Sequence, residues 1–100
     1  MTTELGRLVD VDKDAMEATV RLLREMGASQ VYLYGSAARG ELRPDSDIDM
    51  AVSGLPARLY FSAISKASDI LGRDLDLLDL DDETPWTRRL RASGELIRVG

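Results

Sequence analysis

The sequence predicts a small α/β (α+β) domain in which helices pack on a small mixed β-sheet. Segments with apolar residues at helical spacing alternate with segments in which every second residue is apolar, and glycine or proline separates most of them. The expected order is helix, strand, strand, helix, strand, helix and strand, without internal repeats or low-complexity tracts. The expected elements span residues 12–26, 29–34, 47–53, 56–72, 73–80, 84–93 and 95–99.

The length and composition indicate one globular domain over residues 1–100. The hydrophobic fraction is 44% and the charged fraction 31%, as in ordinary soluble proteins, and no apolar run approaches the ~20 residues of a membrane span. The first ten residues resemble neither a secretory signal nor an organelle presequence, so we expect a cytoplasmic protein.

Charge and residue types exclude several kinds of chemistry. The formal net charge of -5 disfavours direct binding of DNA or RNA, which depends on neutralising phosphates. The chain has no cysteine and no histidine, which excludes disulfides, thiol or imidazole nucleophiles and the usual zinc sites. Any bound metal would therefore be a hard cation held by oxygen ligands.

Three segments have helical periodicity and recognisable ends. The apolar positions of the first two are Met16, Val20, Leu23 and Met26, and then Leu59, Ala63, Ile64, Ala67, Ile70 and Leu71. Gly27 stops the first helix, and Pro56 and Gly72 open and close the second. Thr84 and Pro85 form the cap and first turn of the third helix.

Two aspartates share one face of the second expected strand. Because side chains alternate along a strand, Asp47 and Asp49 project together, about 7 Å apart, while Ile48, Met50 and Val52 point into a core. Two anions this close repel each other unless a cation lies between them. Magnesium prefers one or two carboxylates together with substrate phosphates and water, so the pair suits that ion.

The third expected strand offers another carboxylate if it lies beside the second. Asp74 and Asp76 share one face, whereas the consecutive Leu77 and Leu78 break the alternation and leave Asp79 on the opposite face unless a bulge intervenes. We take Asp76, which is central in the strand, as the third carboxylate, with Asp74 and Asp79 as alternatives.

A glycine turn precedes the aspartates. Gly35 and Gly40 would let backbone amides approach a phosphate, and Ser36 at the start of a short helical turn offers its hydroxyl and its N–H. A P-loop is excluded because Glu41 and Leu42 stand where that motif has Lys and Ser or Thr. The segment therefore predicts a phosphate-binding turn of another kind.

Two further polar residues in this region have open roles. Arg39 is either a surface residue or a contact of a phosphate or of the third carboxylate. Ser46 is either a turn former or a second phosphate donor. We include both among the candidate nucleotide-binding residues.

The combined pattern resembles the signature of the DNA polymerase beta-like nucleotidyltransferases, and most closely the minimal nucleotidyltransferases, called MNT. The pattern is Gly35-Ser36, ten residues, and Asp47-x-Asp49, within Gly-Ser-x-Ala-Arg-Gly and Ser-Asp-Ile-Asp. The resemblance implies that Gly35 and Ser36 hold a triphosphate and that Asp47 and Asp49 bind two magnesium ions. Asp76 would complete the site and help to activate the attacking hydroxyl.

The same resemblance implies a partner. Proteins of this kind are commonly paired with a HEPN ribonuclease toxin and act as its antitoxin by transferring AMP from ATP to a toxin tyrosine. The expected function is therefore magnesium-dependent nucleotidyl transfer from ATP, or another nucleoside triphosphate, to a partner protein.

Two alternatives remain. The chain could be a binding module that neutralises its partner by occlusion alone, with Tyr60, Phe61 and Trp86 as contacts, although core packing is the favoured role of these aromatic residues. It could instead modify a small molecule as a homodimer that completes the substrate pocket. The sequence leaves the oligomeric state and the acceptor open.

Overall fold

The computed structural model describes residues 13–40 and 46–100, in which four strands form one mixed sheet in the order β3-β2-β1-β4. The strands are β1 (Gln30–Leu33), β2 (Ile48–Ser53), β3 (Leu75–Asp79) and β4 (Ile97–Arg98). β1 pairs antiparallel with both β2 and β4, and β2 pairs parallel with β3. The predicted mixed sheet is confirmed, and so is the short last strand, which forms one edge.

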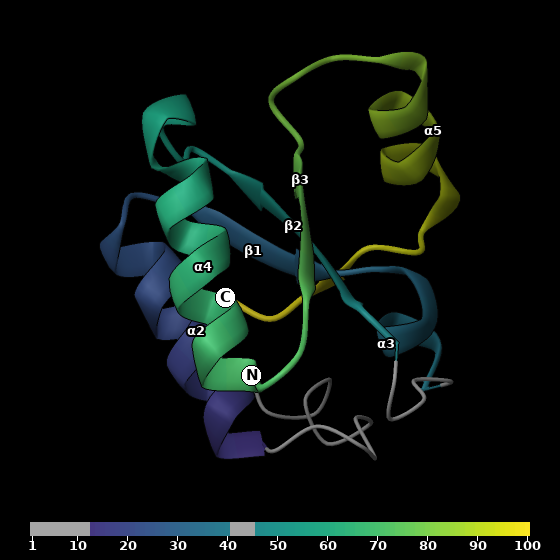
Figure 1. Cartoon of the computed structure of the whole chain (residues 1–100). Helices are drawn as coiled ribbons and strands as arrows, with labels where there is room; N and C mark the ends of the chain where they lie inside the picture. Colours follow the sequence, from purple (N-terminus) through teal and green to yellow (C-terminus); the bar gives the residue numbers. More distant parts are fainter. Residues whose placement is uncertain (1–12, 41–45) are drawn as a thin grey trace.

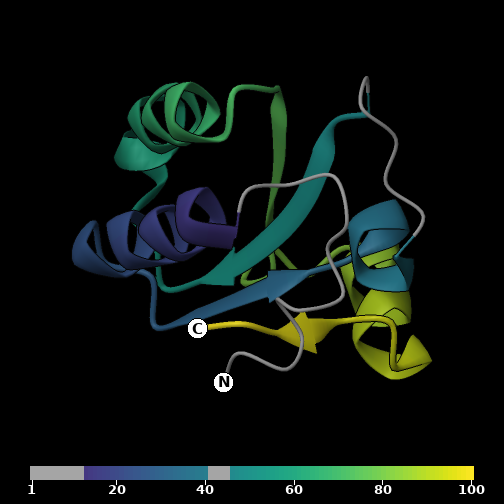
Figure 2. The ribbon, with the colours of Figure 1, turned by 90° about the horizontal axis from the view of Figure 1, so that it is seen from below.

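Helices lie on both sides of the sheet (Figures 1 and 2). They are α2 (Lys13–Glu25), α3 (Gly35–Arg39), the 3₁₀ helix η1 (Ala57–Leu59), α4 (Tyr60–Leu71) and α5 (Pro85–Ser93). α2 and α4 cover one face and α5 lies on the other side, while α3 follows β1 and places Ala37 and Ala38 in the same buried cluster as residues of α2 and α4. α4 connects the parallel strands β2 and β3, as such a pair requires. None of the described helices is both long and apolar enough to cross a membrane.

The helix ends follow the sequence signals, with one difference. Thr84 caps α5: its hydroxyl accepts the N–H of Thr87 at 3.1 Å, while its own N–H donates to the Thr87 hydroxyl at 2.9 Å. The segment after Pro56 does not begin as an α-helix. Its first turn is η1, closed by a hydrogen bond from the Leu59 N–H to the Pro56 carbonyl at 2.9 Å.

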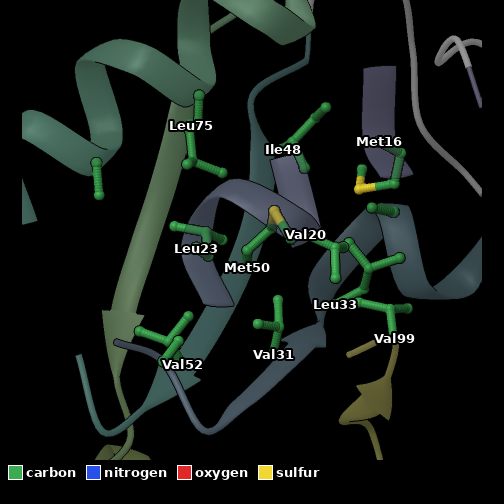
Figure 3. Packing of buried hydrophobic residues seen from close by; sticks show 14 of the residues in the cluster. Met16, Val20, Leu23, Val31, Leu33, Ile48, Met50, Val52, Leu75 and Val99 are labelled. Atoms are coloured by element: carbon green, nitrogen blue, oxygen red, sulfur yellow. The ribbon is translucent and has the colours of Figure 1, made fainter. Parts of the chain in front are cut away.

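The main core lies between the sheet and the pair of helices α2 and α4 (Figure 3). The residues that the figure labels are Met16, Val20, Leu23, Val31, Leu33, Ile48, Met50, Val52, Leu75 and Val99. On β2 the residues Ile48, Met50 and Val52 have no exposed surface, as the strand alternation predicts. This face of the sheet is therefore fully used for packing, and polar chemistry is left to the other face.

A smaller apolar cluster lies on the second face, beneath α5. Its buried members are Tyr34, Ala51, Leu80 and Leu90. α5 has only nine residues, and it places Thr87 and Leu90 in buried positions. The remainder of this face carries the acidic residues described below.

Two of the three aromatic residues expected in the core are exposed. Phe61 is 88% exposed and Trp86 is 47% exposed, while Tyr60 is half-buried. Core packing was the wrong prediction for Phe61 and Trp86. For Phe61 the reason is that α4 buries its small residues Ala63 and Ala67, whose side lies away from Phe61. On α5 the buried residues are Thr87 and Leu90, and Trp86 lies outside them.

Candidate active site

The register of the parallel pair sets Asp49 opposite Asp76. Paired residues on neighbouring strands face the same side, and the strands are about 4.8 Å apart. Both carboxylates therefore project from the face opposite the main core. The condition set for a third carboxylate, that the third strand lies beside the second, is therefore met.

The other acidic residues take different positions. Asp47 is exposed and lies immediately before β2, with the same parity as Asp49. Asp74 is exposed and lies immediately before β3, and Asp79 pairs with Val52 at the far end of the strands. Of the three candidates on the third strand, Asp76 is the one in register with Asp49.

The carboxylates act on one another electrostatically. The pKa of Asp49 is raised, first by burial and then by the negative charges of Asp76 and Asp47, while Arg39 lowers it. Negative charge is thus concentrated at Asp49 without full compensation. A cation bound there would relieve the repulsion.

Gly35 forms the turn that lies against Asp49. Its φ of +66° is in the left-handed region, and a Cβ atom at this position would overlap the Asp49 carboxylate. The backbone N–H of the preceding residue, Tyr34, donates to the Asp49 carbonyl at 3.1 Å. The turn and the strand that carries the carboxylate are therefore in direct contact.

The turn opens directly into α3, a helix of five residues that begins at Gly35. Tyr34, in the N-cap position, supplies no side-chain hydrogen bond to the helix. The first amides of a helix lack intrahelical partners, so those of Gly35 and Ser36 suit an anion such as a phosphate. Gly40 ends the helix with a φ of 72°, which gives it a capping role at the exposed end.

Arg39 and Ser46 lie at the border of the acidic face. The Arg39 Nη1 atom is 4.0 Å from the Glu95 Oε1 atom, and this arginine is near enough to Asp49 to lower its pKa. The Ser46 carbonyl accepts a hydrogen bond from the Arg73 guanidinium at 3.2 Å, which ties the start of β2 to the start of β3. For both residues a role in nucleotide binding stays a prediction. Residues 41–45 of the predicted loop lie outside the described residues.

The donor set fits a magnesium ion, although the side chains are not gathered around one point. Within residues 13–40 and 46–100, no three acidic side chains converge closely enough to surround an ion. Two observations support the fit: Asp47 and Asp76 raise the pKa of Asp49, and the missing side chain of Gly35 leaves space for its carboxylate. Magnesium takes one or two carboxylates together with phosphate oxygens and water, so Asp47 and Asp49 would supply the protein's share of such a site.

Tyr34 is a site residue that the sequence prediction did not include. Its hydroxyl donates to the Oδ2 atom of Asp76 at 3.5 Å, and its ring is buried. The alternation of side chains along the first strand could have indicated this residue. Tyr34 follows Leu33, whose side chain points into the core, so the ring of Tyr34 belongs to the opposite, polar face beside the glycine turn.

The fold defines the class of the protein, and the comparisons identify the family. A four-stranded mixed sheet with the connections found here is the scaffold of the DNA polymerase beta-like nucleotidyltransferases. Residues 19–98 match the family model described as Polymerase beta, Nucleotidyltransferase. The match covers most of the chain, so the chain belongs to this nucleotidyltransferase family. No curated protein sequence matches it.

Solved structures agree with this assignment. One, assigned as a minimal nucleotidyltransferase, has a TM-score of 0.70 at 27% identity, over 88% of this chain and 90% of that one. A toxin–antitoxin complex with AMP-PNP has a TM-score of 0.70 at 24% identity, over 85% of this chain and 69% of that one. A tri-AMPylated Shewanella oneidensis HEPN toxin in complex with an MNT antitoxin has a TM-score of 0.65 at 23% identity, over 86% and 69%. The predicted fold class and enzyme class are confirmed.

The contact between Gly35 and Asp49 predicts an unequal effect of two alanine substitutions. Gly35 and Gly72 have similar positive φ angles, but a Cβ at Gly72 meets nothing within 4 Å. Gly72→Ala should therefore cost only the backbone strain, about 1 kcal/mol. Gly35→Ala should cost about 1–3 kcal/mol more, because of the overlap with Asp49. Urea unfolding measures both, and equal losses would contradict the proposed contact.

The raised pKa of Asp49 predicts that Asp49→Asn stabilises the metal-free protein near neutral pH. The folded-state pKa lies above the ordinary value of 3.8, so protonation favours the folded state. The contribution of Asp49 to stability is thus complete below pH 3.8 and is lost as the pH rises through the raised pKa. The stability difference between the variant and the wild type should grow over that interval and then level off.

Urea unfolding in the presence of a chelator, at a series of pH values, measures this difference. Asp69→Asn on the exposed side of α4 makes the same change in net charge and serves as the control. A pH-dependent gain of the same size in the control would assign the effect to net charge instead of to the site.

Proposed function

We propose that this chain is a magnesium-dependent nucleotidyltransferase that transfers AMP from ATP to a hydroxyl group of a partner protein. The observation that carries the proposal is the register of Asp49 with Asp76 directly beside the turn at Gly35. The nearness of these carboxylates to the backbone amides of the turn supports binding of a cation together with a phosphate. Family membership supports the reaction class.

Each residue of the site has a proposed role. Asp47 and Asp49 hold magnesium, two ions by the family resemblance, and Asp76 completes the ligand set. The amides of Gly35 and Ser36, with the Ser36 hydroxyl, bind the phosphates of the nucleotide. Arg39, Gly40 and Ser46 border this phosphate-binding turn. When bound, magnesium would neutralise phosphate oxygens and favour in-line displacement.

In the proposed reaction the protein mainly positions the nucleotide and the acceptor and accepts a proton. The acceptor hydroxyl oxygen forms a bond to the α-phosphorus, and the bond from that phosphorus to the β-phosphate oxygen breaks to release pyrophosphate. Asp76 takes the proton of the acceptor hydroxyl. Asp76 is exposed, so an acceptor carried by another protein can reach it.

The partner is inferred from two solved structures. One is a toxin–antitoxin complex with AMP-PNP, and the other is an AMPylated HEPN toxin bound to an MNT antitoxin. We infer that this chain likewise acts as an antitoxin, in the cytoplasm, and modifies a tyrosine of a HEPN toxin. The acceptor is expected to be encoded by the neighbouring gene.

The proposed reaction predicts labelling of that partner. The chain, ATP labelled at the α-phosphate, magnesium and the product of the neighbouring gene should yield a labelled partner protein. Asp47→Ala combined with Asp49→Ala should abolish the label, because the cation loses two ligands. Labelling by the double variant at the wild-type rate would refute the proposal.

The position of Asp76 predicts that its neighbour Asp74 is dispensable. Asp76→Asn should lower the rate of labelling by about 100-fold or more, as expected for the loss of a proton acceptor. Asp74→Asn is the matched control, since it neutralises an exposed aspartate two residues earlier, outside the register with Asp49. Comparable losses in both variants would remove the special role assigned to Asp76.

Exposed aromatic residues favour a second candidate function, neutralisation by occlusion alone. Phe61 is 88% exposed and Trp86 is 47% exposed, and such side chains can contact a partner protein. The variant with Asp47→Ala and Asp49→Ala separates the two functions. If it still neutralises the partner without labelling it, occlusion is sufficient.

Labelling of small hydroxylated compounds by a homodimer would instead point to a small-molecule acceptor.

A further inference from the structure

Tyr34 joins the two strands that carry the paired carboxylates. Its backbone N–H donates to the Asp49 carbonyl at 3.1 Å, and its side-chain hydroxyl donates to the Asp76 Oδ2 atom at 3.5 Å. One residue at the end of β1 therefore contacts both members of the aspartate pair, one through its main chain and one through its side chain.

The ring of Tyr34 is held firmly, whereas Asp76 is not. Tyr34 is 8% exposed and packs in the small cluster with Ala51, Leu80 and Leu90. A buried aromatic ring keeps one rotamer in a close-packed surrounding. Asp76 is exposed, and its carboxylate would otherwise rotate in water. The direction of the contact is thus from a fixed donor to a mobile acceptor.

The hydroxyl is suited to act as a permanent donor. The ordinary pKa of a tyrosine hydroxyl is about 10, so the group keeps its proton at neutral pH. Tyr34 consequently stays neutral beside the two carboxylates and adds no further negative charge to the site.

We propose that Tyr34 is a positioning residue of the active site: its hydroxyl fixes the Oδ2 atom of Asp76 and so leaves Oδ1 free for the cation and the acceptor hydroxyl. The inference rests on the proposed function, because it assigns Tyr34 a role in that same site. Hydrogen bonds from such neighbouring groups orient metal ligands in many proteins, and their removal weakens metal binding.

Tyr60 provides a matched control on the opposite face of the sheet. Its hydroxyl is buried near Asp79, but it meets the geometry of a hydrogen bond with none of the described residues. Asp79 lies outside the Asp49–Asp76 pair. Tyr60→Phe therefore removes the same hydroxyl group from a comparable setting without touching the proposed site.

The test measures magnesium binding by the 100-residue chain in the absence of any acceptor. Isothermal titration with Mg²⁺ in the presence of AMP-PNP should show affinity about tenfold weaker for Tyr34→Phe than for the wild type. Tyr60→Phe should match the wild type. In the labelling assay, Tyr34→Phe should need correspondingly more Mg²⁺ for half the maximal rate, and saturating Mg²⁺ should restore most of that rate.

A double-mutant cycle distinguishes positioning from a general effect on folding. If Tyr34 acts through Asp76, then Tyr34→Phe should have no further effect on Mg²⁺ affinity in a protein that already carries Asp76→Asn. An undiminished effect in that background would overturn the inference, as would a wild-type affinity of the single variant. Failure of the wild type itself to bind Mg²⁺ and AMP-PNP would instead overturn the proposed function, and the inference with it.

Discussion

The parallel pairing of β2 with β3 is the constraint on which the site depends. It places Asp49 beside Asp76 although 26 residues separate them, and it requires α4 to cross the sheet between them. The apolar residues of the same two strands fix this register, because a shift by one position would bury carboxylates beneath α2 and α4. The residues that build the core thus also align the acidic groups, although they lie on the opposite face.

The second face of the sheet is divided between packing and chemistry. α5 covers one part through Leu80 and Leu90, and the aspartates occupy another part beside the turn at Gly35. Tyr34 belongs to both parts, since its ring packs under α5 and its hydroxyl contacts Asp76. Packing that would otherwise serve stability alone is thereby connected to the orientation of a carboxylate. The cost of this arrangement is that burial, together with repulsion from Asp76 and Asp47, raises the pKa of Asp49.

Local patterns were sufficient to predict most of the fold. The alternation of apolar residues around Met50 predicted the buried side of β2, and Thr84 with Pro85 predicted the start of α5. The parity argument, which set Asp79 on the opposite face unless a bulge intervenes, agrees with its position opposite Val52. What the sequence left open was which strands would lie together, because pairing over a long separation depends on packing of the whole chain.

The same limit explains what the prediction missed. The contact between Tyr34 and Asp76 joins the residue after β1 to β3, which is not a neighbour of β1 in the sheet. Parity indicates the face on which Tyr34 lies, but no local pattern indicates this partner. The exposure of Phe61 was missed because hydrophobicity alone does not tell which side of α4 is covered. The roles proposed for Arg39 and Ser46 depend on contacts with a bound nucleotide. The structure shows only that both residues lie at the border of the site.

Because β3 lies at the edge of the sheet, its aspartates also affect how the protein associates with other molecules. An edge strand carries unpaired backbone groups that can recruit a strand from another molecule, and charged side chains on it oppose such association. Asp76 and Asp79 project from opposite faces of this edge, so approach from either side meets negative charge. Asp76, which is proposed for catalysis, therefore also helps the protein to resist aggregation, and selection for solubility would act on the same residue as selection for activity.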